Sequence, residues 1–180
     1  MKRCAWCNEN NPVYMQYHDA EWGRPRFDDT YLLEMLILES FQAGLSWECV
    51  LNKRENFRRA FDGFERAKIM AYDAEKQEKL ACDPGIIRNR RKIKAAVDNA
   101  VIFDAVVHEY GSFIAYLKQF WDGETIFERD LTHNELSDRI SADLIKRGMK
   151  FVGTTIVYSY LQAVGIVNSH EKTCFLYQTK

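Results

Sequence analysis

The apolar residues of this chain recur every three or four positions, which is the spacing that one buried face of an α-helix requires. Leu32, Met35 and Leu36 follow this spacing in one segment, and Ile93 and Val97 follow it in another. Residues that break helices are few, with three prolines and nine glycines in 180 residues. No run of alternating apolar and polar residues bounded by turn signals indicates a β-hairpin. The sequence therefore predicts an all-α fold.

The helical spacing predicts a series of helices joined by short connections, with one longer connection over 120–133. We expect helices over 29–43, 46–60, 65–72, 75–82, 88–110, 112–119, 134–147 and 154–165. No internal repeat, low-complexity tract or linker rich in Gly, Ser or Pro divides the chain, so we expect one domain over 1–180. Residues 1–27 are aromatic-rich with little helical period, and we expect them to form loops that line a pocket or cover the edge of the core.

Composition limits the class of protein more than it identifies it. No apolar run is long enough to span a membrane and the N-terminus lacks the apolar segment of a signal peptide, so we expect a cytoplasmic protein without membrane contact. The 25 basic residues balance 26 acidic ones, so total charge does not indicate a nucleic-acid partner. Five cysteines form an odd set, which in a reducing compartment favours thiols or metal ligands over disulfides.

Glu39 occupies a position at which the helical pattern calls for an apolar side chain. A buried acid is costly without a partner. Gly44 can end this helix, Ser46 can cap the next one, and Trp47 would then lie beside the carboxylate. A carboxylate next to an aromatic face suits a planar heterocycle that carries N–H donors. The alternative is that the helix reaches solvent at Glu39 and the acid is hydrated.

A helix, a short hairpin and an apolar helix follow one another around residues 146–165. The backbone N–H groups of Gly153, Thr154 and Thr155 would lie at a helix N-terminus, where the dipole favours an anion such as phosphate, and Lys150 adds positive charge. This hairpin could hold a DNA backbone without reading its sequence. The alternative is an ordinary turn with hydrated cations.

A second turn, at residues 83–87, leads into a segment with five cations within seven residues, including Arg88 and Arg90. Such a segment predicts a locally basic face despite the balanced total charge. The alternative, again, is an exposed helix face. The two hairpins together favour binding to a nucleic-acid backbone.

Two cysteines and two histidines near the chain ends form a possible zinc-binding set. Cys4 and His18 lie near the N-terminus, and His170 and Cys174 are four residues apart near the C-terminus. A metal held by all four would join 1–27 to 166–180 and close a large loop. Two alternatives remain at this point: Cys7 competes with Cys4, and His18 could be a core histidine without metal.

Longer motifs follow one another in a fixed order through nearly the whole chain. They are RCAW at 3–6, YMQYHDAEWG at 14–23, LE at 38–39, QAGLSW at 42–47, LNKRE at 51–55, GIIRNR at 85–90, RGMKFVGTT at 147–155 and VNSH at 167–170. In these motifs the chain resembles the 3-methyladenine DNA glycosylase I family of the helix-hairpin-helix glycosylase superfamily. The resemblance implies an α-helical fold and excision of 3-methyladenine from alkylated double-stranded DNA in base excision repair.

The resemblance also implies residue roles. Structural zinc would be held by Cys4, His18, His170 and Cys174. Glu39, on which catalysis would depend, would receive hydrogen bonds from the methylated base and orient it without acting as the base that activates water. Tyr17 and Trp47 would stack on the ring. Residues expected nearby are Tyr14, Trp6 and Trp22.

Many members of the superfamily have a catalytic aspartate where this chain has Asn168, and an amide cannot act as a carboxylate base. This agrees with the glycosylase I pattern, in which the substrate base is already cationic and leaves readily. No lysine is placed to form a Schiff base with the sugar, so we expect a monofunctional enzyme, acting as a monomer without an obligate protein partner. The alternative that Asn168 leaves open is a non-catalytic helix-hairpin-helix protein that binds damaged DNA.

Overall fold

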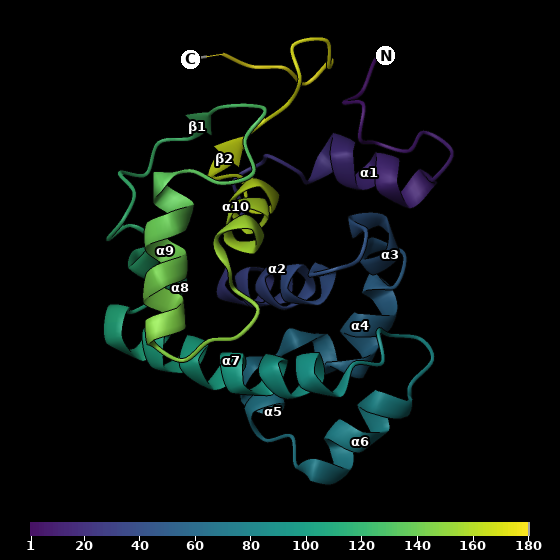
Figure 1. The fold of residues 1–180 in the computed structure, drawn as a ribbon, viewed down its shortest axis with the longest axis vertical. Helices are drawn as coiled ribbons and strands as arrows, with labels where there is room; N and C mark the ends of the chain where they lie inside the picture. The colour runs from purple at the N-terminus through teal and green to yellow at the C-terminus, as the bar shows by residue number, and fades with distance from the viewer. Residues whose placement is uncertain (180) are drawn as a thin grey trace.

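The computed structural model describes residues 1–179, and this part of the chain is almost entirely helical (Figure 1). The elements, in order, are α1 (Pro12–Ala20), α2 (Asp29–Gln42), α3 (Trp47–Leu51), α4 (Arg54–Ala60), a 3₁₀ turn (Asp62–Phe64), α5 (Arg66–Met70), α6 (Ala74–Cys82), α7 (Arg90–Tyr110), α8 (Phe113–Leu117), β1 (Ile126–Phe127), α9 (Glu135–Lys146), α10 (Thr154–Ala163) and β2 (Val167–Asn168). The all-α fold is therefore confirmed.

Helix α2 runs through the centre of the molecule, between α10 and α7 (Figure 1). It begins where the side chain of Asp28 accepts a hydrogen bond from the backbone N–H of Tyr31 at 2.9 Å. It ends before Gly44, whose φ of 81° lies in the left-handed region that stops a helix. Every residue from Tyr31 to Phe41 is buried, as expected of a helix covered on all sides.

The longest helix, α7, forms one border of the molecule, with α5, α6 and α8 packed against it. Asn89 caps its N-terminus by accepting from two backbone N–H groups, and Gly111, with φ 87°, ends it. Its buried stripe follows the spacing that the sequence showed. This helix thus supports α2 from below in the view of Figure 1.

Helices α9 and α10 pack side by side and are joined by the short loop 147–153. Asn134 and Ser137 form a reciprocal capping box at the start of α9. The loop turns at Gly148, with φ 105°, and at Phe151, with φ 55°. This is the helix, short hairpin and apolar helix that the sequence predicted.

The N-terminal and C-terminal segments lie at the same end of the molecule (Figure 1). The parallel strands β1 and β2 join the long connection 120–133 to the C-terminal segment. The backbone N–H of Phe175 donates to the carbonyl of Lys2 at 2.9 Å. The two terminal segments are therefore in contact, as they would have to be for one metal to bind both the Cys4–His18 pair and the His170–Cys174 pair.

The structure corrects two of the expected segments. Residues 12–20 form helix α1, where we expected loops; Asn11 as cap, Pro12 at the first position and aromatic residues at 14 and 17 were helix signals that the shortness of the segment concealed. The expected helix over 46–60 is two helices, because the chain turns at Asn52 and Lys53. The other helix ends differ from the expected ones by at most two residues. That the whole chain forms one domain stays a prediction.

No helix within residues 1–179 is both long enough and apolar enough to cross a bilayer.

Candidate active site and metal centre

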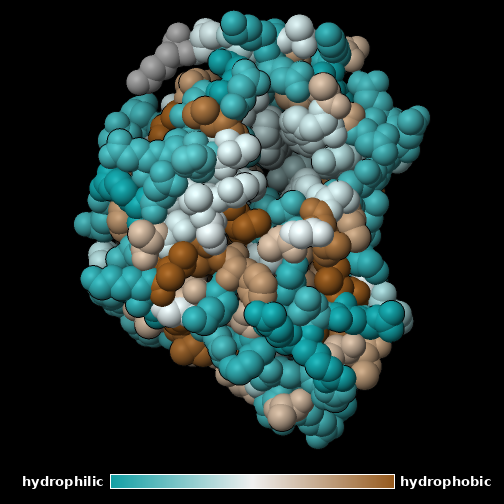
Figure 2. Space-filling view, in the orientation of Figure 1, coloured by the Kyte–Doolittle hydropathy of each residue, from teal (hydrophilic) through white to brown (hydrophobic). Residues whose placement is uncertain are grey.

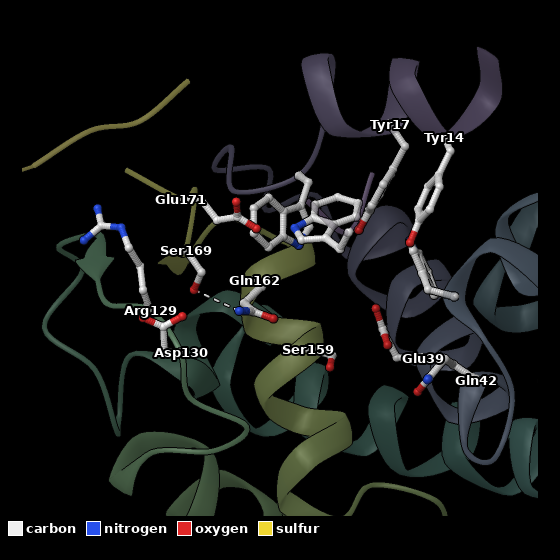
Figure 3. Close-up of a pocket in the computed structure, with 13 residues that line it drawn as sticks. Tyr14, Tyr17, Glu39, Gln42, Arg129, Asp130, Ser159, Gln162, Ser169 and Glu171 are labelled. Atoms are coloured by element: carbon white, nitrogen blue, oxygen red, sulfur yellow. Dashed lines mark hydrogen bonds between the residues drawn. The ribbon is translucent and has the colours of Figure 1, made fainter. Parts of the chain in front are cut away.

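A cavity of about 290 Å³ opens between α1, the C-terminal end of α2, α10 and the C-terminal segment. Figure 2, in the orientation of Figure 1, shows the cavity as a hollow in the upper half of the molecule, and Figure 3 shows the side chains that surround it. The lining residues are Trp6, Tyr14, Tyr17, Trp22, Glu39, Gln42, Trp47, Arg129, Asp130, Ser159, Gln162, Ser169 and Glu171. The structure thus brings together Glu39 and all five aromatic residues that the sequence analysis named for the base.

The Glu39 carboxyl group lies inside the protein and faces this cavity (Figure 3). The residue is 3% exposed, so the alternative of a hydrated helix end is wrong. No group among residues 1–179 donates a hydrogen bond to it, and burial alone raises its pKa to about 8. At neutral pH the Glu39 carboxyl group is therefore mostly protonated, and a cation or strong donor in the cavity would favour its ionisation.

Aromatic rings form the walls of the cavity next to Glu39. Tyr14 and Tyr17 extend from α1, one turn apart, and Trp47 begins α3. The turn before Trp47 is built as the sequence predicted, since Ser46 accepts from the N–H of Cys49 at 3.2 Å. The Tyr17 and Trp47 rings lie 5.4 Å apart at 53°, which places them in contact with each other. They form two adjoining walls and leave no space for a base between them.

Two further indoles cover the far side of the cavity. Trp6 packs edge-on against Trp22 with ring centroids 4.7 Å apart, and it also contacts Tyr14 at 5.3 Å. The Nε1–H of Trp47 is buried and has no hydrogen-bond partner among residues 1–179. A buried donor of this kind is costly, and a ligand acceptor would relieve it.

Sequence reasoning missed the polar wall of the cavity. Ser159 and Gln162 lie one turn apart on α10, and the Gln162 Nε2–H donates to Ser169 Oγ at 2.8 Å. This leaves the Gln162 carbonyl oxygen as the free end of the amide. The signal was present in the sequence, because Ser159 and Gln162 interrupt the apolar run over 156–164.

The start of α10 exposes backbone donors. Gly153 and Thr155 are exposed, and no side chain caps the helix. The Thr154 hydroxyl donates to Asp138. Lys150 is exposed, and its backbone forms two hydrogen bonds with the buried Asn99 side chain. These residues therefore offer the unpaired N–H groups and the cation that the sequence predicted for an anion.

The basic segment at the start of α7 is less open than the sequence suggested. Arg88 is exposed, Arg90 pairs with Glu78, and Lys94 pairs with Asp98 at 2.7 Å. Lys92 is buried, so the interpretation of all five cations as one surface face is wrong at this position. Lys92 lies three and four residues before Ala95 and Ala96, which are buried, so the helical period places its side chain on the buried face of α7.

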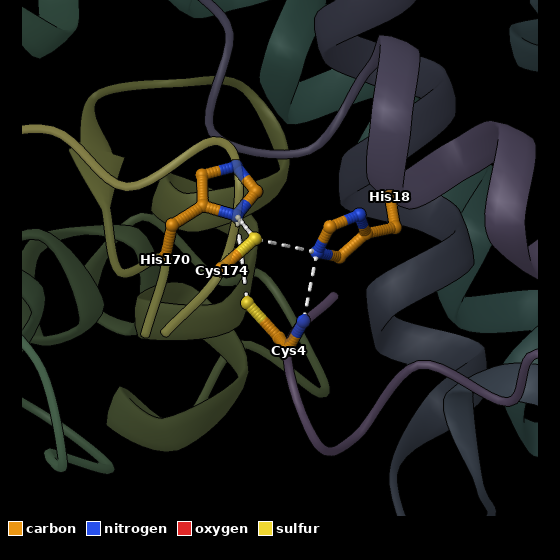
Figure 4. A group of neighbouring side chains, drawn as sticks. All are labelled: Cys4, His18, His170 and Cys174. Atoms are coloured by element: carbon orange, nitrogen blue, oxygen red, sulfur yellow. Dashed lines mark hydrogen bonds between the residues drawn. The ribbon is translucent and has the colours of Figure 1, made fainter. Parts of the chain in front are cut away.

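Cys4, His18, His170 and Cys174 converge at the meeting point of the chain ends (Figure 4). All four are buried, and their ligand atoms lie within 4.8 Å of one another, a group that could hold a metal ion. Cys7 lies outside this group, with its Sγ near the carbonyl oxygen of Tyr14 at 3.9 Å. The structure therefore resolves the competition between the two N-terminal cysteines in favour of Cys4.

The surroundings of the four donors suit a cation. Asp19 accepts from His18 Nδ1 at 2.8 Å, which directs the other ring nitrogen of His18 toward the cysteines, and Arg3 holds Asp19 through Nη2 at 2.7 Å. Burial raises the pKa of the Cys4 thiol to about 12, and burial lowers the pKa of His170 to about 4. Cys4 and His170 are thus uncharged by themselves, and a divalent cation would displace the Cys4 thiol proton.

Comparison with known proteins supports one assignment. Residues 6–177 match the family model of methyladenine glycosylase. The chain is 44% identical to DNA-3-methyladenine glycosylase 1 of Escherichia coli (strain K12), over 98% of this chain and 97% of that protein. A crystal structure of 3-methyladenine DNA glycosylase I superposes with a TM-score of 0.94 at 43% identity, over 98% and 100% of the two chains.

A variant of 3-methyladenine DNA glycosylase I, solved in complex with 3-methyladenine, superposes with a TM-score of 0.91 at 34% identity, covering 97% of this chain and 96% of that one. Family model and relatives both extend over nearly the whole length, including the segments that form the cavity. The chain therefore belongs to the methyladenine glycosylase family.

Proposed function

We propose that this protein excises 3-methyladenine from alkylated double-stranded DNA by hydrolysing the N-glycosidic bond, as a monofunctional enzyme of base excision repair. Membership of the methyladenine glycosylase family supports the reaction. One structural observation carries the proposal: the buried Glu39 carboxyl group, which has no hydrogen-bond partner among residues 1–179, lies in a cavity with aromatic walls. An enzyme that acts on a base must take that base out of the helix and into such a pocket.

Charge explains how the cavity would distinguish damaged from normal adenine. Methylation at N3 makes the nucleotide base cationic, and Glu39 would ionise to accept a hydrogen bond from its exocyclic amine. The base would lie on the Trp47 or Tyr17 face, where a cation–π interaction contributes roughly 0.5 to 2 kcal/mol. Normal adenine brings no positive charge, so ionising the buried acid would not be compensated. Selection would therefore come from electrostatics together with the shape of the cavity.

Water would attack C1′ as the bond to the cationic base breaks. Asn168 does not line the cavity: its amide donates to the Gly23 carbonyl at 3.4 Å and accepts from the His170 N–H at 3.2 Å. It therefore orders the chain around itself and supplies no carboxylate to the reaction. Hydrolysis would rely on the good leaving group, with Glu39 binding and orienting the base.

DNA would be held by its phosphate backbone. The exposed N–H groups at Gly153, Thr154 and Thr155 would bind one phosphate, and Lys150 would add charge. Arg88 and Arg90 would contact the backbone from the start of α7, Arg90 by exchanging its partner Glu78 for a phosphate. Such contacts bind DNA of any sequence.

Zinc would be the metal of the Cys4, His18, His170 and Cys174 cluster, since two thiolates and two imidazoles are a tetrahedral zinc set. Four protein donors leave no open coordination position, so the ion would be structural. It would tie the segment that carries Trp6 and helix α1 to the C-terminal segment, and would thereby fix one wall of the cavity. We further propose that the enzyme acts as a monomer in the cytoplasm.

Chromatography of the bases released from methylated DNA tests the function. The purified protein should release free 3-methyladenine without cutting the strand, and Glu39→Gln should release it much more slowly. Glu75→Gln, on the exposed face of α6, is the matched control and should equal the parent. Binding to methylated DNA without release of a base would instead establish the alternative of a damage-binding protein, and strand cleavage without heat or base would contradict monofunctionality.

A further inference from the structure

The ammonium group of Lys92 lies between two parts of the molecule that act on the same nucleotide. Its Nζ donates to the carbonyl oxygen of Phe41 at 2.7 Å, in the last turn of α2, and to that of Ala43 at 2.5 Å, the residue that directly follows the helix. These carbonyls belong to the end of a helix and have no partner within it. A cation at this end is also favoured by the helix dipole. Lys92 thus fixes the end of the helix that carries Glu39 and the turn that leads to Trp47.

The same ammonium group faces the loop between α9 and α10. Its Nζ lies 5.7 Å from the ring centroid of Phe151, within range of a cation–π contact. Phe151 has φ 55°, a left-handed conformation that is unfavourable for a residue with a side chain. This conformation is therefore maintained by what the ring contacts. One buried side chain touches both the end of the cavity helix and the loop proposed to hold DNA.

Asn99 makes a second connection from the same helix. It lies seven residues after Lys92, on the same face of α7, and is 1% exposed. Its amide donates to the Lys150 carbonyl at 2.9 Å and accepts from the Lys150 N–H at 2.8 Å, a pairing that fixes the loop backbone in both directions. Figure 1 shows the α9–α10 loop running along α7 where these contacts form.

We propose that Lys92, with Asn99, is a positioning residue that sets the distance between the base cavity and the phosphate-binding loop. This inference rests on the proposed function, because the two sites must hold one nucleotide at once. A base is joined to its phosphates by a sugar of fixed length. A small shift between the sites would leave each able to bind its part and would misplace the glycosidic bond, and a displacement of about 1 Å can cost roughly a hundredfold in rate.

Lys92→Met removes the charge and the donors while keeping the length of the side chain. We expect single-turnover excision to fall at least about tenfold, while the affinities for free 3-methyladenine and for undamaged duplex each change less than about threefold. Lys79→Met, at an exposed lysine of α6 that pairs with Glu75, is the matched control for the rate and should keep the parent rate. Lys94→Met, on the exposed side of α7, is the control for the structural measurement below. Lys92→Arg keeps a cation with several donors and should restore part of the rate.

Backbone hydrogen exchange gives a readout that does not depend on activity. Lys92→Met should accelerate exchange in 43–47 and 148–153 together, and Lys94→Met in neither. Equal acceleration throughout the protein, or an unchanged excision rate in Lys92→Met, would overturn the inference. If the parent released no base, the proposed function would fail by itself, and the exchange result would still decide whether Lys92 joins the two segments.

Phe151→Leu provides a second variant in case Lys92→Met does not fold. It removes only the ring that the ammonium group faces, at a half-buried position. We expect the same pattern with a smaller loss of excision rate and with base affinity retained. An excision rate equal to that of the parent would show that the contact between Lys92 and the loop does not set the distance.

Discussion

Helix α2 carries two buried glutamates, and they differ in whether positively charged side chains pair with them. Glu34, 6% exposed, accepts from Arg54 Nε at 2.7 Å and from Arg58 Nε at 2.8 Å, and Arg54 also reaches Glu21 at 2.7 Å. Glu39, 3% exposed, has no such partner within residues 1–179.

Burial by itself would lower the pKa of Arg54, yet Glu34 and Glu21 hold it above its ordinary value, whereas burial raises the pKa of Glu39 to about 8. A paired buried charge serves the structure, and an unpaired one is held ready for a ligand.

The largest expected effect comes from breaking the paired site. Arg54→Met should lower the free energy of unfolding by about 3 to 5 kcal/mol, because Glu34 would remain buried with only the half-exposed Arg58 as partner. Urea denaturation measures this change. Arg59→Met, exposed on the same helix, should change stability little. A loss from Arg54→Met no larger than that of the control would show that the ion pairs around Glu34 do not support the fold.

The unpaired site should respond in the opposite direction. Below pH 4.5 Glu39 is protonated in both folded and unfolded protein, whereas between pH 4.5 and 8 only the unfolded chain ionises, so the parent loses stability as pH rises through this range. Glu39→Gln lacks this loss and should be more stable than the parent above pH 8 by a few kcal/mol, at about 1.4 kcal/mol per pKa unit. Parallel pH profiles of unfolding for the two proteins would contradict this.

The same acid predicts how ligand binding depends on pH. Binding of a fixed cation such as 3,9-dimethyladeninium requires ionised Glu39, so affinity should rise nearly tenfold per pH unit up to about pH 8 and then level off. Calorimetry would measure the affinity and the proton released on binding. Glu39→Gln should show weak binding that does not vary with pH, and a pH-dependent affinity in that variant would assign the titration to another group.

A smaller effect on base binding is expected at Trp47, where two variants distinguish the contribution of the ring from that of the buried N–H. Trp47→Ala should weaken base binding by about 1 to 3 kcal/mol through lost stacking. Trp47→Phe keeps an aromatic face and removes the N–H, so its loss relative to the parent measures what the buried donor adds, and the difference between the two variants measures what the aromatic face adds. Fluorescence or calorimetric titration with the fixed cation gives both numbers. Equal losses would mean that the face contributes nothing.

The smallest effect is expected at the surface, where paired and unpaired cations can also be compared. Lys150→Ala should weaken binding to any duplex modestly and reduce the slope of log affinity against log salt by about 0.9, the value for one phosphate contact. Arg90 must first leave Glu78, so Arg90→Ala should reduce the slope less. Fluorescence anisotropy at several salt concentrations measures both slopes. A larger reduction from Arg90→Ala would reverse the ranking.

Much of this molecule could be predicted from its residues. Helical spacing gave the all-α fold and most helices within a few residues, and Glu39 was visible as an acid at an apolar position. The four cysteine and histidine side chains that could hold a metal could be chosen by residue type, but their convergence could not be predicted, because the two pairs are separated by most of the chain. Helix α1 was missed because it is short, and the Ser159 and Gln162 wall was missed because periodicity does not say which face of a buried helix borders a cavity.

Local sequence by itself determined where helices begin and end, since caps such as Asp28 and Asn89 and left-handed glycines such as Gly44 act within a few residues. Tertiary structure alone decided which charges became buried partners and which stayed free. Lys92 and Lys94 differ by two positions and look alike in the sequence, yet one holds the end of α2 and the other faces solvent. The reason is physical: the energy of a charge depends on the solvent and partners that distant segments bring to it.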